Sequence, residues 1–250
     1  NNIRKIVASG KYRYNDIQIM TRDLESCILN IERAFVENGI PFFIDQADSM
    51  AQHPLLEFIT SLFAIKKNHY RLNDVMRLLR TELFVPSTSK EGTENANITW
   101  REQIDITENV ALAYGMKGND WIQDEDCQYV RFNLDEEYKQ TEAEIQIQET
   151  ANYVRGIFKN SIVPFLDSLT EELTNIEFSK KLYQFLLDIG VINQLQTWRD
   201  ELVETGELAE AREHEQAWDT FISLLDEFVE ILGDEIWDLD AFISIIETGF

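Results

Sequence analysis

Apolar residues recur at helical spacing along most of this 250-residue chain. From Leu55 to Leu83, and again from Ile147 to Leu232, they repeat at steps of three and four, which places them on one side of a helix. The clearest stripe consists of Trp218, Phe221, Ile222, Leu225, Phe228, Val229 and Leu232. These stripes predict a mostly helical fold, in which each helix buries one apolar face.

Two short segments near the start have a different pattern. Ile17 and Ile19 alternate with a polar residue, and residues 40–44 are rich in β-branched and aromatic side chains, so both segments are typical of strands. A helical stripe from Leu24 to Phe35 lies between them. Two strands flanking a helix indicate a βαβ unit, which needs a larger sheet to bury both of its faces. We therefore expect a small α/β part with an incomplete parallel sheet, followed by helices.

The chain contains one polar, turn-rich stretch that is typical of a linker, residues 86–95. It divides the sequence into residues 1–85, which contain the predicted βαβ unit, and residues 86–250, which are predicted to be helical. We expect these two parts to be separate domains. Within the second part, residues 115–126 are predicted to form a loop that packs Trp121.

The charge of the chain limits its partners. There are 46 Asp and Glu residues but only 22 Lys and Arg, which gives a formal net charge of −24. Phosphates must be neutralised by basic side chains, so this chain alone is expected to bind DNA weakly or not at all. No apolar run is long enough for a membrane span, and two widely separated cysteines are typical of the reducing cytoplasm.

The sequence contains no complete motif for phosphate or metal binding. Gly10-Lys11 and the run from Gly115 to Gly118 lack the spacing of a phosphate-binding loop, so both are predicted to be turns. The carboxylate clusters at 124–126 and 234–240 lack the spacing of a calcium loop and are interpreted as solvated acid. We therefore expect neither a catalytic site nor a metal site in this chain.

The three histidines are far apart in the sequence and belong to no hydrolase motif. His53 directly precedes Pro54 at the predicted start of a helix, so a capping or structural role is favoured over catalysis for it. All three histidines, His53, His69 and His214, are interpreted as isolated residues.

Several segments together resemble the second motor domain of UvrD-like helicases, beginning at the fourth motif of that group. Within the group, the amino-acid sequences of these segments are most similar to those of the B subunits of ATP-dependent helicase/deoxyribonucleases of the RexB/AddB type. The segments that carry this resemblance are 16–22, 38–44, 49–57 and, more faintly, 112–118. The chain begins without an initiator Met, and both of its ends look cut, so we expect it to be an internal piece of such a protein.

The resemblance implies a role for Arg22. In UvrD-like helicases, an Arg at the end of the fourth-motif strand reaches the γ-phosphate of ATP, and Ile19-Met20-Thr21-Arg22 occupies the matching place. Many active helicases continue with Arg-Thr-Asn, whereas this chain has Arg22-Asp23-Leu24. Two interpretations stay open: a phosphate contact in the full protein, or a surface Arg that pairs with Asp23 or Glu25.

The resemblance also implies a domain plan and a role. Residues 1–85 would be the first half of the second motor-like domain, and residues 86–250 would be the helical insertion within it. The full B subunit would form a heterodimer with an A subunit that has helicase and nuclease activity. This complex would bind DNA, ATP and Mg²⁺ and process double-strand breaks for recombinational repair. The present segment would be non-catalytic, shaping the DNA channel and contacting the A subunit.

Two other interpretations stay open from the sequence. The acidic helices could form an independent scaffold or adaptor that binds protein partners, with the βαβ unit a chance likeness. An unrelated enzyme is the third possibility, and a preformed nucleotide pocket would indicate it.

Overall fold

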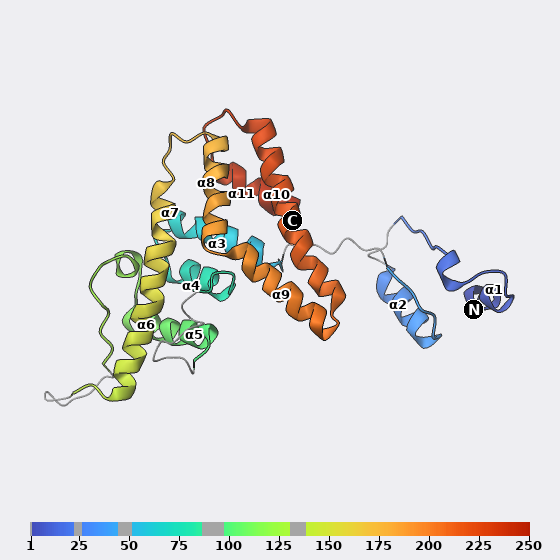
Figure 1. The fold of residues 1–250 in the computed structure, drawn as a ribbon, viewed down its shortest axis with the longest axis horizontal. Helices are drawn as coiled ribbons and strands as arrows, with labels where there is room; N and C mark the ends of the chain where they lie inside the picture. The colour runs from blue at the N-terminus through green and yellow to red at the C-terminus, as the bar shows by residue number, and fades with distance from the viewer. Residues whose placement is uncertain (1, 23–26, 45–51, 87–97, 131–138) are drawn as a thin grey trace. The chain divides into compact units, whose positions relative to one another are not determined.

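The computed structural model describes residues 2–22, 27–44, 52–86, 98–130 and 139–250. The chain divides into two compact units, Asn1–Ser49 and Met50–Phe250. The predicted linker lies almost entirely outside the described residues, and the domain division at residues 85 and 86 stays a prediction. All helices from α3 to α11 belong to the second unit (Figure 1).

The first unit contains α1 (Asn2–Ala8), the short 3₁₀ helix η1 (Tyr14–Asp16) and α2 (Ile28–Glu37). The prediction of a βαβ parallel sheet is wrong, because no strand occurs anywhere in the described residues. Residues 17–21 and 40–44 have neither helical nor strand structure. Alternating apolar residues favour extended backbone, but a strand also needs a neighbouring strand to satisfy its hydrogen-bonding groups, and the described ranges contain no such neighbour.

The first unit has little core of its own. Ile40 is the one buried hydrophobic residue among its described residues, whereas Met20 and Phe43 are 84% and 86% exposed. The ring of Phe35 on α2 packs edge-on against Phe42, with ring centroids 5.3 Å apart. Such a small apolar contact can contribute only modestly to stability.

The second unit is helical throughout its described residues, apart from connecting segments. Its elements, in order, are α3 (Pro54–Lys67), α4 (Leu72–Arg80), α5 (Trp100–Tyr114), η4 (Gly118–Trp121), α6 (Glu142–Ser161), α7 (Val163–Ser168), α8 (Asn175–Asp188), α9 (Val191–Thr205), α10 (Leu208–Leu232) and α11 (Leu239–Gly249). An isolated antiparallel bridge joins Thr174 to Ile236. The predicted fold class, a mostly helical chain with a small parallel-sheet part, is therefore wrong, because the described residues are helical and contain no sheet.

Local sequence explains where several of these helices begin and end. Thr99, Thr141 and Thr174 each cap a helix, and each forms a capping box with the Glu three residues later. Gly115, with φ of 62°, ends α5 in the left-handed conformation that glycine adopts readily. Pro164 lies in the first turn of α7, directly after α6, where its missing N–H costs nothing.

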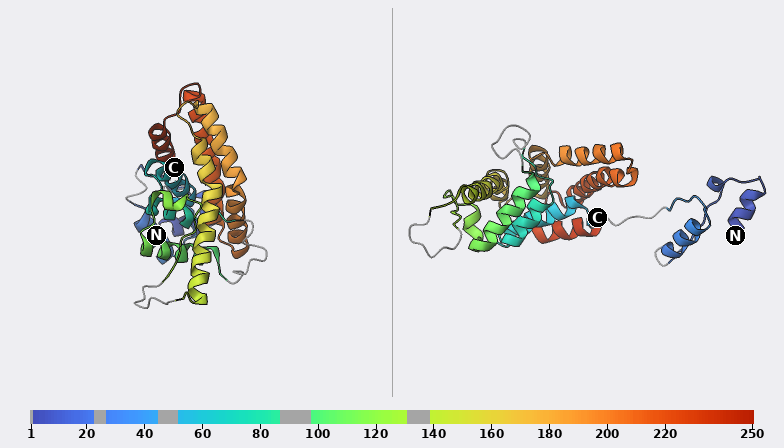
Figure 2. Two further views of the ribbon diagram at one scale, coloured as in Figure 1. Left: turned by 90° about the vertical axis from the view of Figure 1, so that its left-hand side faces the viewer. Right: turned by 90° about the horizontal axis from the view of Figure 1, so that it is seen from below.

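Three helix pairs organise the second unit. α3 packs against α4 and α11, α5 packs along α6, and α9 and α10 form a long hairpin that also contacts α8. In Figure 1, α9 and the first half of α10 extend away from the other helices as an arm, and Figure 2 shows the same arm from below. We call residues 191–219, which form this part of the hairpin, the α9–α10 arm.

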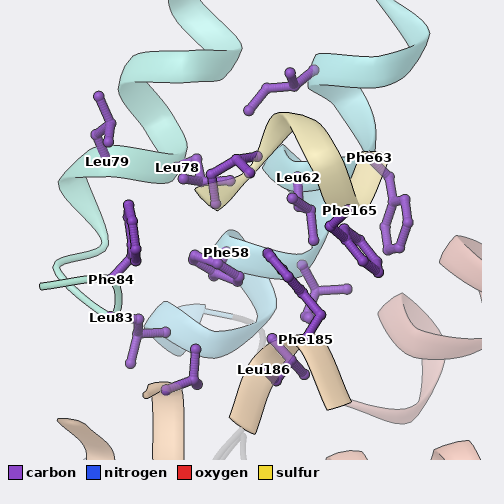
Figure 3. Packing of buried hydrophobic residues seen from close by; sticks show 14 of the residues in the cluster. Phe58, Leu62, Phe63, Leu78, Leu79, Leu83, Phe84, Phe165, Phe185 and Leu186 are labelled. Atoms are coloured by element: carbon purple, nitrogen blue, oxygen red, sulfur yellow. The ribbon is translucent and has the colours of Figure 1, made fainter. Parts of the chain in front are cut away.

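The core of the second unit is one continuous apolar cluster. α3 lies inside it, because seven of its hydrophobic residues are buried and they point to several sides: Leu55, Leu56, Phe58, Ile59, Leu62, Phe63 and Ile65. Figure 3 shows Phe58 and Leu62 packed among side chains of α4, α7 and α8. The rings of Phe165 and Phe185 stack with centroids 4.0 Å apart, so α7 is held firmly on α8.

Candidate functional site

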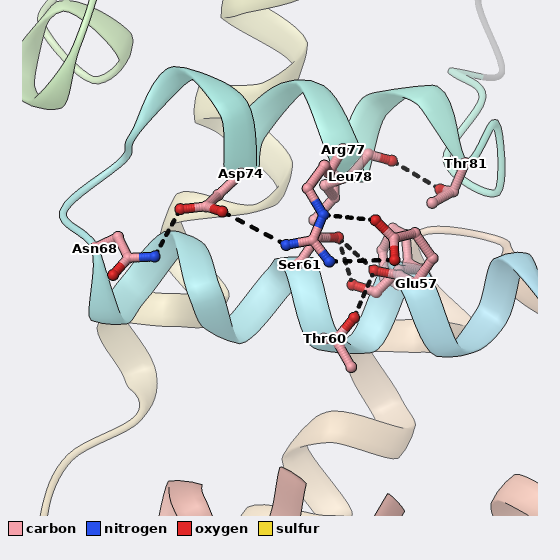
Figure 4. Close-up of polar contacts among 9 residues, drawn as sticks. Glu57, Thr60, Ser61, Asn68, Asp74, Arg77, Leu78 and Thr81 are labelled. Atoms are coloured by element: carbon pink, nitrogen blue, oxygen red, sulfur yellow. Dashed lines mark hydrogen bonds and ion pairs between the residues drawn. The ribbon is translucent and has the colours of Figure 1, made fainter. Parts of the chain in front are cut away.

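A polar network joins α3 to α4 on the outside of the core (Figure 4). The Arg77 guanidinium donates to both oxygens of Glu57, at 2.6 and 3.2 Å, and lies 3.6 Å from Asp74. Asn68 donates to the other oxygen of Asp74 at 2.8 Å. The hydrogen bonds to Glu57 raise the pKa of Arg77. The Arg77 and Glu57 side chains are nearly half exposed, so this network aligns two helices without adding much stability.

His53 caps the start of α3, as the sequence predicted. Its Nδ1 accepts a hydrogen bond from the backbone N–H of Leu55 at 3.1 Å, and Pro54 follows in the first turn. The prediction that the histidines are isolated is wrong for His53 and for His214. His53 Nε2 lies 2.9 Å from His214 Nδ1, so a side chain of α10 reaches the start of α3 across 161 positions of sequence.

The hydrogen bonds fix the protonation of this histidine pair. Because His53 Nδ1 accepts from Leu55, its proton is on Nε2, which donates to Nδ1 of His214. His214 then carries its own proton on Nε2. Burial, with His214 as a second cause, lowers the pKa of His53 to about 4. Burial also lowers the pKa of His214, although Glu210 opposes this shift. Both rings are therefore neutral near pH 7.

The pair is better suited to joining helices than to binding a metal. A metal ion on His53 Nε2 would require the ring proton to move to Nδ1, and the cap on Leu55 would then be lost. In the described part of the chain, no group of three or more potential metal ligands converges. Asp124 instead pairs with Lys159, and Asp238 caps α11.

The turns predicted at the two glycine–lysine sequences are confirmed. Gly10 follows α1 with φ of 74°, and Gly115 ends α5.

Two basic side chains of the second unit, Lys66 and Arg155, donate hydrogen bonds to backbone carbonyl groups. Lys66 donates to Leu166 and Leu169 at the end of α7, and the buried Arg155 donates to Asp120 and Glu125 in the loop around η4.

A pocket of about 360 Å³ lies between α9 and α10, beside the histidine pair. Its lining includes the indole ring of Trp218, the guanidinium of Arg199 and the carboxylates of Glu215 and Asp219. The other residues that line it are Ile192, Leu195, Gln196 and His214. The Trp198 ring also packs on His214, with centroids 5.4 Å apart. Because this pocket combines aromatic and charged groups, we take it as the candidate functional site.

Arg22 lies in the first unit, at a bend that follows a segment with neither helical nor strand structure. Its side chain is exposed, and no ion pair joins it to another described residue. Asp23 and Glu25, its possible partners in sequence, lie outside the described residues. One exposed guanidinium fits a single phosphate contact, but the described neighbours of Arg22 do not enclose a nucleotide. Its role therefore stays a prediction.

No family model matches the chain. Individual proteins do match it over nearly its whole length. It is 39% identical, over 99% of its residues, to the B subunit of the ATP-dependent helicase/deoxyribonuclease from Enterococcus faecalis, and equally to that from Pediococcus pentosaceus. The Bacillus subtilis protein of the same name is 36% identical over 99% of the chain. The chain corresponds to one segment of these B subunits. It spans about a fifth of the length of these relatives.

These matches confirm the resemblance to B subunits of ATP-dependent helicase/deoxyribonucleases that was drawn from segments near the start of the chain. They extend that resemblance through the helices of the second unit, because the matches cover 99% of the chain. Within the described residues, no helix has the length and apolar character needed to cross a bilayer.

The pocket and the histidine pair could not be found from sequence alone. His214 is separated from His53 by most of the chain, and only the packing of α10 against α3 and α9 brings the two together. The nearest local signal was the position of Trp198 and Trp218. Both belong to helical apolar stripes, which more often indicate core residues than a binding site.

Proposed function

We propose that this chain is a non-catalytic, architectural part of the B subunit of a helicase/deoxyribonuclease. In this proposal it supports the DNA channel of the complex and contacts the partner protein, and the complex processes double-strand DNA breaks for repair by recombination. The observation that carries the proposal is the 34–39% identity to B subunits across the first and second units together. The second unit has one continuous apolar core, and the chain has a net charge of −24. These properties fit a structural element that contacts proteins better than they fit a DNA-binding element.

The same proposal includes the nucleotide chemistry of the full complex. ATP and Mg²⁺ would bind there, and Arg22 would supply one contact to an ATP phosphate. The described residues offer no set of Mg²⁺ ligands, so we assign none to this chain. The complex would work in the cytoplasm. The independent scaffold is less well supported, since chance likeness does not explain identity along the whole chain.

Two properties of the purified chain test this proposal. It should neither hydrolyse ATP nor cut DNA, and in excess it should compete with the full-length B subunit for the A-type partner. Competition is measured by the loss of the labelled full-length protein from the heterodimer on size-exclusion chromatography. Hydrolysis or cleavage by the chain itself, or a heterodimer unaffected by any excess of it, would contradict the proposal.

Replacing Arg22 tests the phosphate contact. In the full-length B subunit, Arg22→Ala should weaken ATP binding about 10- to 100-fold, because a charge-assisted hydrogen bond is worth about 1.5–3 kcal/mol. Fluorescence titration with a labelled ATP analogue measures this change. Arg33→Ala is the matched control, since Arg33 is also an exposed arginine of the first unit and pairs only with Glu37 among described residues. Equal affinities for the wild type and Arg22→Ala would refute the contact.

A further inference from the structure

The pocket between α9 and α10 has the shape and charge to receive one side chain from another protein. Its volume of about 360 Å³ suits a long side chain. Trp218 is half-buried and offers an aromatic surface, while Glu215 and Asp219 lie one helical turn apart on α10. We propose that this pocket binds a basic side chain, Arg or Lys, of a protein partner.

The arginine inside the pocket disfavours an anionic ligand. Arg199 already uses all three of its guanidinium nitrogens: Nε and one terminal nitrogen donate to Asp200 at 2.9 and 2.7 Å, and the other donates to Glu215 at 2.9 Å. A phosphate that reached the two remaining N–H groups would lie beside these carboxylates and be repelled by them. DNA or a free nucleotide is therefore a poor occupant of this site.

The charge around the pocket favours a cation. The α9–α10 arm, residues 191–219, carries eight carboxylates and two arginines. Within the described part of the chain, no hydrogen bond or ion pair engages the exposed Asp219. A cation above the Trp218 ring and beside Asp219 would gain both a cation–π contact and an ion pair. The arm also projects from the other helices, so a partner can approach it (Figure 1).

The identity of the partner rests on the proposed function. If the chain supports a heterodimeric complex, the basic side chain belongs to the A-type partner. Complementary charge at such an interface speeds association and fixes the docking position. Arginine is also among the residues enriched at energetic anchors between proteins, which lie in well-packed pockets.

Titration of the chain with arginine amide tests the pocket without the partner. The readout is the NMR signal of the tryptophan indole N–H groups, assigned with Trp198→Phe and Trp218→Phe variants. Arginine amide should shift the Trp218 and Trp198 signals and saturate in the millimolar range, whereas inorganic phosphate should not. Asp219→Asn should weaken this binding about fivefold, because it removes the carboxylate and keeps the shape.

Asp226→Asn is the matched control. Asp226 is also exposed and lies two turns further along α10, about 10 Å from Asp219, outside the pocket lining. This variant should bind arginine amide like the wild type. The proposal is overturned if phosphate produces the same shifts, if arginine amide produces none at Trp218, or if the two variants weaken binding equally.

The same variants in the full-length B subunit test the partner. Asp219→Asn should raise the dissociation constant of the heterodimer five- to tenfold, and Asp226→Asn should leave it unchanged. If the chain competes for the A-type partner but Asp219→Asn has no effect, the pocket assignment fails and the proposed function stands. If the chain does not compete at all, the proposed function fails, whatever the arginine titration gives.

Discussion

Phe178→Ala should lower the free energy of unfolding of the second unit by about 3–5 kcal/mol, the cost of a large cavity in a well-packed core. Phe178 is fully buried on α8 and packs against three other rings. Its centroid lies 4.6 Å from Trp237, 4.9 Å from Phe242 and 5.7 Å from Phe63, so it joins α3, α8 and the last part of the chain. Urea unfolding followed by circular dichroism measures the change.

Tyr183→Ala is the control for this experiment, because Tyr183 is an aromatic residue of the same helix that is 41% exposed. Tyr183→Ala should lower the free energy of unfolding by much less than Phe178→Ala, about 1 kcal/mol. If both variants unfolded at the same urea concentration, the second unit would not have the continuous core described above.

The stability of the chain should fall in mild acid because of His53. Its folded-state pKa of about 4 lies below the ordinary value of 6.5, so the unfolded chain binds more protons between these two pH values. The stabilisation is therefore fully present above pH 6.5 and is lost as the pH falls to about 4. The shift corresponds to about 3 kcal/mol. Protonation also breaks the cap on Leu55, because Nδ1 can then no longer accept.

His53→Asn separates this effect from the titration of the many carboxylates. Asn keeps an acceptor for the start of α3 but does not titrate. The difference in unfolding free energy between the wild type and His53→Asn, measured by urea unfolding at pH 7 and at pH 4, should change by about 3 kcal/mol in favour of the variant at the lower pH. Parallel pH profiles for the two proteins would show that His53 is not a buried neutral ring.

Features with local causes could be predicted from sequence, and features that depend on distant residues could not. The stripe from Trp218 to Leu232 lies in α10, and His53 with Pro54 marks the start of α3. Trp121 is fully buried in the loop around η4, as expected, against Phe158. In each of these cases neighbouring residues carry the signal.

The sheet prediction failed for the opposite reason. Ile17 and Ile19 alternate as strand residues do, yet a strand exists only with a partner backbone, and its pairing is not encoded in the segment itself. The histidine pair and the α9–α10 pocket likewise depend on how whole helices pack. The resemblance to B subunits was predicted correctly although the sheet was not. It depended on the order and identity of residues and not on their expected secondary structure.

Zero-length carbodiimide cross-linking of the assembled heterodimer tests the central claim most directly, because it joins a carboxylate to a lysine only where the two touch. Mass spectrometry then identifies the linked residues. If this chain is a supporting segment that contacts the partner, carboxylates of the α9–α10 arm should be joined to lysines of the A-type partner. An intact heterodimer in which no carboxylate of this chain is joined to the partner would contradict that account.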